Sequence, residues 1–109
     1  QLGNLVKVDA GFSLGTNWLT STIPTELGKL VELVRSFTLS SNYLVATIPT
    51  ELGGLSKLIQ SFGVASNRLT SSIPSELGGL KSMMLAFDLR SNLLSSTIPT
   101  ELGNMLEME

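Results

Sequence analysis

The stretch Thr22-Ile23-Pro24-Thr25-Glu26-Leu27-Gly28 decides the fold, because near-copies of it recur along the chain at a step of 25 residues. The later copies begin at Thr47, Ser72 and Thr97, and each runs through Ile-Pro to Glu-Leu-Gly. All four prolines and all four phenylalanines occupy single columns of this repeat. A constant step with identical residues in register predicts a solenoid, in which each coil stacks on the one before it.

The interior of this solenoid is predicted by the slots that hold an apolar residue in every copy. Each copy has to bury its apolar edge against its neighbours, so these slots face inward. In the second unit they are Leu27, Leu30, Leu33, Phe37, Leu39, Leu44 and Ile48. The other units place there Leu2, Leu5, Val8, Phe12, Leu14, Leu19 and Ile23, then Leu52, Leu55, Leu58, Phe62, Val64, Leu69 and Ile73, then Leu77, Leu80, Met83, Phe87, Leu89, Leu94 and Ile98, and finally Met105 and Met108.

Two local periods predict the elements within one coil. The pair Phe37-x-Leu39 alternates with small polar residues, which is typical of a short strand. The run Leu27-x-x-Leu30-x-x-Leu33 has a period of three, which favours a 3₁₀ or irregular helical turn over a long α-helix. We expect Thr25 to cap that turn and Glu26 to lie in its first turn, where a helix dipole favours a carboxylate.

The asparagine column needs a separate reason, since Asn17, Asn42, Asn67 and Asn92 recur between apolar slots. An amide can bond the main chain of its own turn and of a neighbouring coil. We predict that the stacked asparagines form an internal ladder, which satisfies backbone groups hidden from water. The alternative is a set of unconnected turn asparagines that face solvent.

Composition excludes several kinds of function. The 109 residues have room for one domain, and the net charge of −2 is scattered singly, which disfavours nucleic acid as a partner. Apolar runs are too short for a membrane span in this segment. Cysteine and histidine are absent, which excludes a disulfide, a thiolate zinc site and a histidine-based triad within these residues. We expect no cofactor, no metal site, no catalytic residue and no enzyme activity.

The string Leu-x-x-Leu-x-x-Leu, followed by Leu-x-x-Asn-x-Leu and Ile-Pro-x-Glu-Leu-Gly-x-Leu, resembles the plant-type leucine-rich repeat, with Ile-Pro-Thr-Glu-Leu-Gly phrasing similar to that of algal members. The resemblance implies an α/β leucine-rich-repeat solenoid of about four 25-residue coils. It also implies a parallel β-sheet on the concave face, short 3₁₀ or helical turns on the convex side and a second, shorter strand after the asparagine turn. We expect residues 1–109 to form a single segment, with repeats at about 2–26, 27–51, 52–76 and 77–101 and a partial unit at 102–109, and to be a fragment of a longer chain.

Two departures from the plant-type pattern affect the expected backbone. The repeat has one residue more than the usual unit, placed between Leu33 and Phe37, so we expect a bulge or a longer turn before the main strand. The glycine that usually follows the Asn-x-Leu segment is replaced by Ser21, Ala46, Ser71 and Ser96. Glycine permits conformations that these residues resist, so the shape of the second strand stays open.

The expected surface offers one column with strong binding residues. The outward strand residues are mostly small and neutral: Gly11, Ser13, Gly15, Ser36, Thr38, Ser40, Ser61, Gly63, Ala65, Ala86, Asp88 and Arg90. The column after the asparagines holds Trp18, Tyr43, Arg68 and Leu93 instead. Because interfaces take much of their energy from Trp, Tyr and Arg, we predict a partner-binding site there, with Asp88 and Arg90 close by. The alternative is that the aromatic residues merely cover the edge of the sheet.

These patterns favour a binding or scaffolding module that presents a rigid surface to another protein, and membership of a larger assembly stays open. A different class of function is binding to ice or another flat lattice, through the stacked hydroxyls of segments such as Thr20-Ser21-Thr22 and Ser95-Ser96-Thr97. The resemblance favours an extracellular or cell-surface location, and an organelle or an intracellular assembly stays open.

Overall fold

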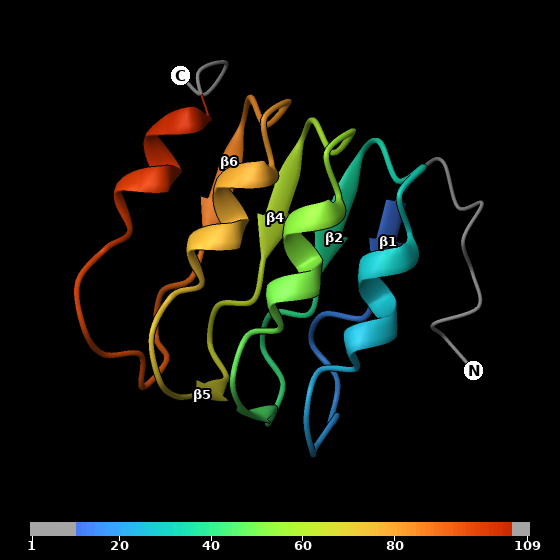
Figure 1. Ribbon diagram of the computed structural model, residues 1–109. Helices are drawn as coiled ribbons and strands as arrows, with labels where there is room; N and C mark the ends of the chain where they lie inside the picture. Colours follow the sequence, from blue (N-terminus) through green and yellow to red (C-terminus); the bar gives the residue numbers. More distant parts are fainter. Residues whose placement is uncertain (1–10, 106–109) are drawn as a thin grey trace.

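The computed structural model describes residues 11–105, which wind into successive coils (Figure 1). A four-stranded parallel sheet runs through the coils in the order β1-β2-β4-β6. Its strands are β1 (Gly11–Ser13), β2 (Ser36–Thr38), β4 (Ser61–Gly63) and β6 (Ala86–Asp88). Each residue pairs with its equivalent in the next coil, as Phe12 does with Phe37. The predicted solenoid and its parallel sheet are therefore confirmed.

The rest of each coil contains a helical return, and two of the coils also have a short second strand. The second sheet pairs β3 (Val45–Ala46) with β5 (Arg68–Leu69) after the asparagine turn, as the resemblance implied. The returns are the 3₁₀ helices η2 (Thr25–Lys29), η3 (Thr50–Gly54), η4 (Ser75–Gly79) and η5 (Thr100–Asn104). Figure 1 shows these helical turns stacked in a row in front of the main sheet.

The core is a set of stacked columns. Phe12, Phe37, Phe62 and Phe87 form a continuous ring stack, with neighbouring ring centroids 5.6, 5.4 and 5.5 Å apart. The predicted apolar slots of the second and third units are buried, apart from the half-buried Ile73. In the last unit Ile98 is 71% exposed, which departs from the predicted burial of that slot. The predicted core residues Leu2, Leu5, Val8 and Met108 lie outside the described residues.

The helical return begins one residue earlier than expected. Pro24, and not Thr25, occupies the cap position of η2, with an extended backbone at φ −64° and ψ 132°. The prediction that Thr25 is the cap is therefore wrong. Proline is fixed near this φ, so it suits the position without a side-chain hydrogen bond. The Thr25 hydroxyl instead donates to the Glu26 carboxylate at 3.3 Å.

The additional residue of the repeat is accommodated just before the main strand. There the carbonyl of Arg35 accepts hydrogen bonds from two consecutive N–H groups of the next coil, those of Gln60 at 2.9 Å and Ser61 at 3.1 Å. One carbonyl thus accepts from two N–H groups. The strands that follow, β2 and β4, then pair residue by residue at equivalent positions of the repeat.

The backbone at the replaced glycines keeps the conformation that glycine favours. Ser21, Ala46, Ser71 and Ser96 all have left-handed φ values, between 66° and 71°. An L-residue there places its Cβ close to a carbonyl oxygen, which costs about 1–2 kcal/mol. The repeat imposes this shape on every coil, because the turn is fixed by hydrogen bonds to its neighbours, such as the one from Ser95 N–H to the Ser71 carbonyl at 2.8 Å.

Ser71→Gly is therefore expected to stabilise the protein. Glycine relieves the left-handed strain but loses more entropy on folding, so the net gain is about 0.5–1 kcal/mol. The matched control is Ser72→Gly, because the neighbouring Ser72 is also exposed and has no positive φ. Urea denaturation should show a higher midpoint for Ser71→Gly and a lower one for Ser72→Gly. A midpoint below the wild-type value for both variants would contradict the interpretation that the backbone at Ser71 is strained.

Candidate protein-binding site

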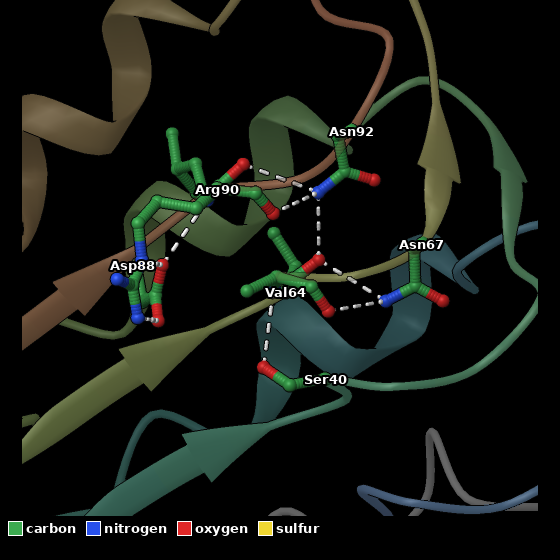
Figure 2. A network of polar contacts seen from close by, with 8 residues as sticks. Ser40, Val64, Asn67, Asp88, Arg90 and Asn92 are labelled. Carbon is green, nitrogen blue, oxygen red and sulfur yellow. Dashed lines mark hydrogen bonds and ion pairs between the residues drawn. The ribbon is translucent and has the colours of Figure 1, made fainter.

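The residues of the candidate site directly follow the asparagines of the turns. The asparagine side chains connect neighbouring coils by hydrogen bonds (Figure 2). The amide nitrogen of Asn67 donates to the carbonyls of Val64 at 3.1 Å and Ala65 at 3.2 Å in its own coil, and of Leu39 at 3.1 Å in the preceding coil. Its side-chain oxygen accepts from the Leu44 N–H at 3.0 Å. One buried amide thus satisfies main-chain groups of two coils.

The same pattern occurs one coil earlier and one coil later. Asn42 donates to the carbonyls of Leu14 and Leu39, both at 2.9 Å, and Asn92 donates to that of Val64 at 3.0 Å. Asn17 is exposed, and its amide donates to the carbonyls of its own turn. The turns are therefore rigid, and the residue that follows each asparagine projects from a fixed frame.

Asn42→Ala is expected to lower the free energy of unfolding by about 1–3 kcal/mol, because it leaves buried main-chain groups without partners. Asn17→Ala is the control, since the exposed Asn17 side chain bonds only its own turn among the described residues. Chemical denaturation of both variants measures the difference. An unfolding midpoint for Asn42→Ala that equals the wild-type value would rule out the interpretation.

The predicted binding column follows the asparagines as a continuous stack. We call Trp18, Tyr43, Arg68 and Leu93 the exposed column. The rings of Trp18 and Tyr43 stack with centroids 5.6 Å apart and planes 20° apart. The Arg68 guanidinium lies 5.0 Å from the centroid of the Tyr43 ring, within the range of a cation–π interaction. Trp18 is 82% exposed and Leu93 65% exposed.

A hollow of about 410 Å³ lies beside the first two members of the exposed column. It is lined by Thr16, Asn17, Trp18, Ser41, Asn42, Tyr43 and Ser66. Thr16, Ser41 and Ser66 have left-handed backbones at equivalent positions of the turn. Hydroxyl groups and ring edges therefore share one shallow surface.

Asp88 and Arg90 form a local ion pair at the end of the last strand of the main sheet (Figure 2). The guanidinium donates through Nε to Asp88 Oδ1 at 2.9 Å and through Nη2 to Oδ2 at 3.0 Å. These bonds from Arg90, together with its backbone N–H, hold the pKa of the Asp88 carboxyl below its ordinary value. Because both carboxylate oxygens already have donors, Asp88 has little left to offer a partner.

The outer face of the main sheet is smoother than expected. Gly63 and Ala65 are buried, so the prediction that they are open positions of this face is wrong. The Ser40 side chain covers them: its hydroxyl oxygen lies 3.0 Å from where a Cβ of Gly63 would be, and it accepts from the Ala65 N–H at 3.1 Å. This face therefore presents few anchors for a partner.

A second concave surface runs along the second sheet and the helical returns. It is a trough of about 810 Å³. Hydroxyl side chains line it on both sides of three Ile-Pro pairs: Thr22 and Thr25, Thr47 and Thr50, and Ser72 and Ser75. The carboxylates of Glu51 and Glu76 also line it.

Other kinds of site find little support in the described part of the chain. Within residues 11–105 no group of three or more acidic side chains is placed to hold a metal ion. No helix of that range has the length and hydrophobicity that crossing a lipid bilayer requires.

Comparison with known proteins identifies the class. The sequence profile of the Leucine Rich Repeat family matches residues 85–105. The structure of PEPR1–AtPEP1 is similar to this chain with a TM-score of 0.90 and 30% identity, over 99% of this chain and 15% of that one. The plant peptide hormone receptor RGFR1 in complex with RGF2 gives a TM-score of 0.89 and 36% identity, over 99% and 17% of the two chains. The chain is a plant-type leucine-rich-repeat protein.

A third similar structure has a different function. A plant ice-binding protein matches with a TM-score of 0.82 and 30% identity, over 94% of this chain and 32% of that one. No curated protein sequence matched the chain. The chain spans about a sixth of the PEPR1 and RGFR1 chains and about a third of the ice-binding protein.

Proposed function

We propose that this segment is a protein-binding module and that a partner protein contacts it through the exposed column. The observation that carries the proposal is the exposed stack of Trp18, Tyr43 and Arg68 beside a hollow. These three residue types dominate the energetic centres of protein interfaces. An aromatic residue that only covers a sheet edge would be largely buried, whereas Trp18 is 82% exposed.

The relatives are consistent with this proposal. Two of the similar structures are named as complexes with AtPEP1 and RGF2, and the second is described as a peptide hormone receptor. Proteins that contain the fold of this chain are thus described together with a bound partner. For the present chain, the partner is inferred from the surface alone.

The test is a triple variant, Trp18→Ala with Tyr43→Ala and Arg68→Ala. Peptides selected against the wild-type protein from a displayed library of random linear peptides should bind the triple variant at least about tenfold more weakly, because truncation of interface centres commonly costs more than 1 kcal/mol each. The thermal unfolding midpoint should stay close to the wild-type value, since the column is exposed. Selected peptides that bind both proteins equally, or failure to select any peptide, would refute the proposal.

Binding to ice is the second candidate function, favoured by the likeness to the plant ice-binding protein and by the hydroxyl rows at Thr22, Thr47, Ser72 and Thr97. A flat lattice needs a flat array, whereas these hydroxyls border a trough of about 810 Å³. We therefore expect no thermal hysteresis in a solution of the wild-type protein. A hysteresis that Thr47→Lys abolishes and the triple variant retains would assign the function to the trough instead.

A further inference from the structure

The exposed column has a distinctive chemistry, because its polar groups are hydrogen-bond donors. Trp18 carries an indole N–H, Tyr43 a phenolic O–H and Arg68 a guanidinium with five N–H groups. The rings of Trp18 and Tyr43 stack face to face along the solenoid, so their edges point outward. Ring edges carry partial positive charge. Three successive coils therefore present positive or donating groups to solvent.

The charge of Arg68 is also uncompensated by a neighbouring carboxylate. The ion pairs among residues 11–105 join Lys57 to Glu32 and Arg90 to Asp88, and neither involves Arg68. The chain as a whole has a net charge of −2, and Arg68 supplies the one formal positive charge of the exposed column. The repeated glutamates lie elsewhere, each in the first turn of a 3₁₀ helix, as Glu26 does in η2 and Glu51 in η3.

We propose that the exposed column binds a short, extended, acidic peptide segment, with a carboxylate of that segment on the Arg68 guanidinium; this rests on the proposed function and names the partner's chemistry. A carboxylate matches the planar fork of a guanidinium and can accept two parallel hydrogen bonds from it. The far side of that guanidinium is held over the Tyr43 ring, which limits its freedom before binding.

The dimensions of the column fit such a segment. Neighbouring coils of a parallel sheet lie about 4.8 Å apart, so the four members of the column span roughly 14 Å. An extended peptide rises about 3.3 Å per residue, so four to five residues would cover that span, as a rough match. Leu93, 65% exposed at one end, would contact an apolar side chain of the segment.

The other end of the segment would lie along Tyr43 and Trp18. There the indole N–H and the phenolic O–H can donate to the carbonyl groups of an extended backbone, which has no internal partners for them. The neighbouring hollow offers the hydroxyl groups of Ser41 and Ser66 to the same acceptors. A basic segment would place a second cation beside the Arg68 guanidinium, so the column selects against it.

The experiment compares peptide selections against the wild-type protein and against Arg68→Glu, using the same displayed library of random linear peptides. Peptides selected by the wild-type protein should carry an excess of Asp and Glu. They should bind Arg68→Glu at least about tenfold more weakly, because the variant places like charges opposite each other. Their affinity should also fall as salt is added. Selection against Arg68→Glu itself should shift towards Lys and Arg.

A matched control separates the local charge from the net charge. Arg35→Glu makes the same change in net charge at an exposed arginine before β2, away from the exposed column, and should leave binding of the acidic peptides unchanged. If the wild-type protein selects neutral or basic peptides, and these bind the triple variant more weakly than the wild type, the acidic specificity is overturned and the proposed function stands. Peptides that bind independently of the column would overturn both.

Discussion

Gly53→Ala is expected to lower the free energy of unfolding by about 2–3 kcal/mol, the upper range for overpacking a close-packed interior. The reason lies in the stacking of the helical returns. A Cβ added to Gly53 would collide with the main-chain carbonyl oxygen of Glu76 in the next coil. This carbonyl belongs to the main chain, so it cannot rotate away from the added Cβ as a flexible side chain could. The main sheet, on the other side of the coil, also fixes the spacing between coils.

The same repeat position supplies the control for that prediction. At Gly103 an added Cβ would meet no heavy atom of residues 11–105 within 4 Å. Gly103→Ala removes a glycine from an equivalent 3₁₀ helix, so both variants share the intrinsic effect of the substitution. Urea denaturation should show a large loss for Gly53→Ala and little change for Gly103→Ala. Equal midpoints for the two variants would contradict the close stacking.

Phe62→Ala is expected to cost about 3–5 kcal/mol, which is typical of truncating a fully buried aromatic ring. Phe62 lies inside the ring stack, with Phe37 on one side at 5.4 Å and Phe87 on the other at 5.5 Å. Its removal leaves a cavity between two coils and breaks both contacts. The exposed column should lose its regular spacing as well, because the same coils carry Tyr43 and Arg68.

Phe87→Ala provides the comparison for the cavity argument. Phe87 is half-buried and stacks on a single phenylalanine among the described residues, so its truncation should cost distinctly less. Thermal unfolding of the two variants gives the order directly. A Phe87→Ala variant that is less stable than Phe62→Ala would place the centre of the core elsewhere.

Most of the fold follows from the sequence, because a strict period constrains every coil at once. The position of a residue within the repeat assigns Phe37 and Phe62 to the core, and it places the asparagines at equivalent turns. The stacking of Trp18 on Tyr43 follows in the same way, since residues one period apart must be neighbours in a solenoid. The identity of the partner-binding residues stays a prediction, because exposure shows where a partner can bind and not that it does.

The features that the period did not predict depend on close contacts between coils. A main-chain carbonyl of the next coil lies against Gly28, and another lies against Gly53. The repeated Leu-Gly pair in the sequence does not indicate these contacts. The left-handed backbone at Ala46 runs against the preference of alanine and is set by the neighbouring coils. Burial of Ala65 likewise depends on the Ser40 hydroxyl of the preceding coil, which accepts from the Ala65 N–H, and alternation along one strand cannot predict such a contact between coils.

The most direct test of the exposed column uses its own reporter, because Trp18 is the single tryptophan of the chain. Its fluorescence is measured while an acidic peptide selected by the wild-type protein is titrated in, with acrylamide as a neutral quencher. If the peptide binds across the column, the emission should shift to shorter wavelength and acrylamide should quench it less, since the 82% exposed indole becomes covered. Saturable binding that leaves both the emission and its quenching unchanged would place the binding surface away from Trp18.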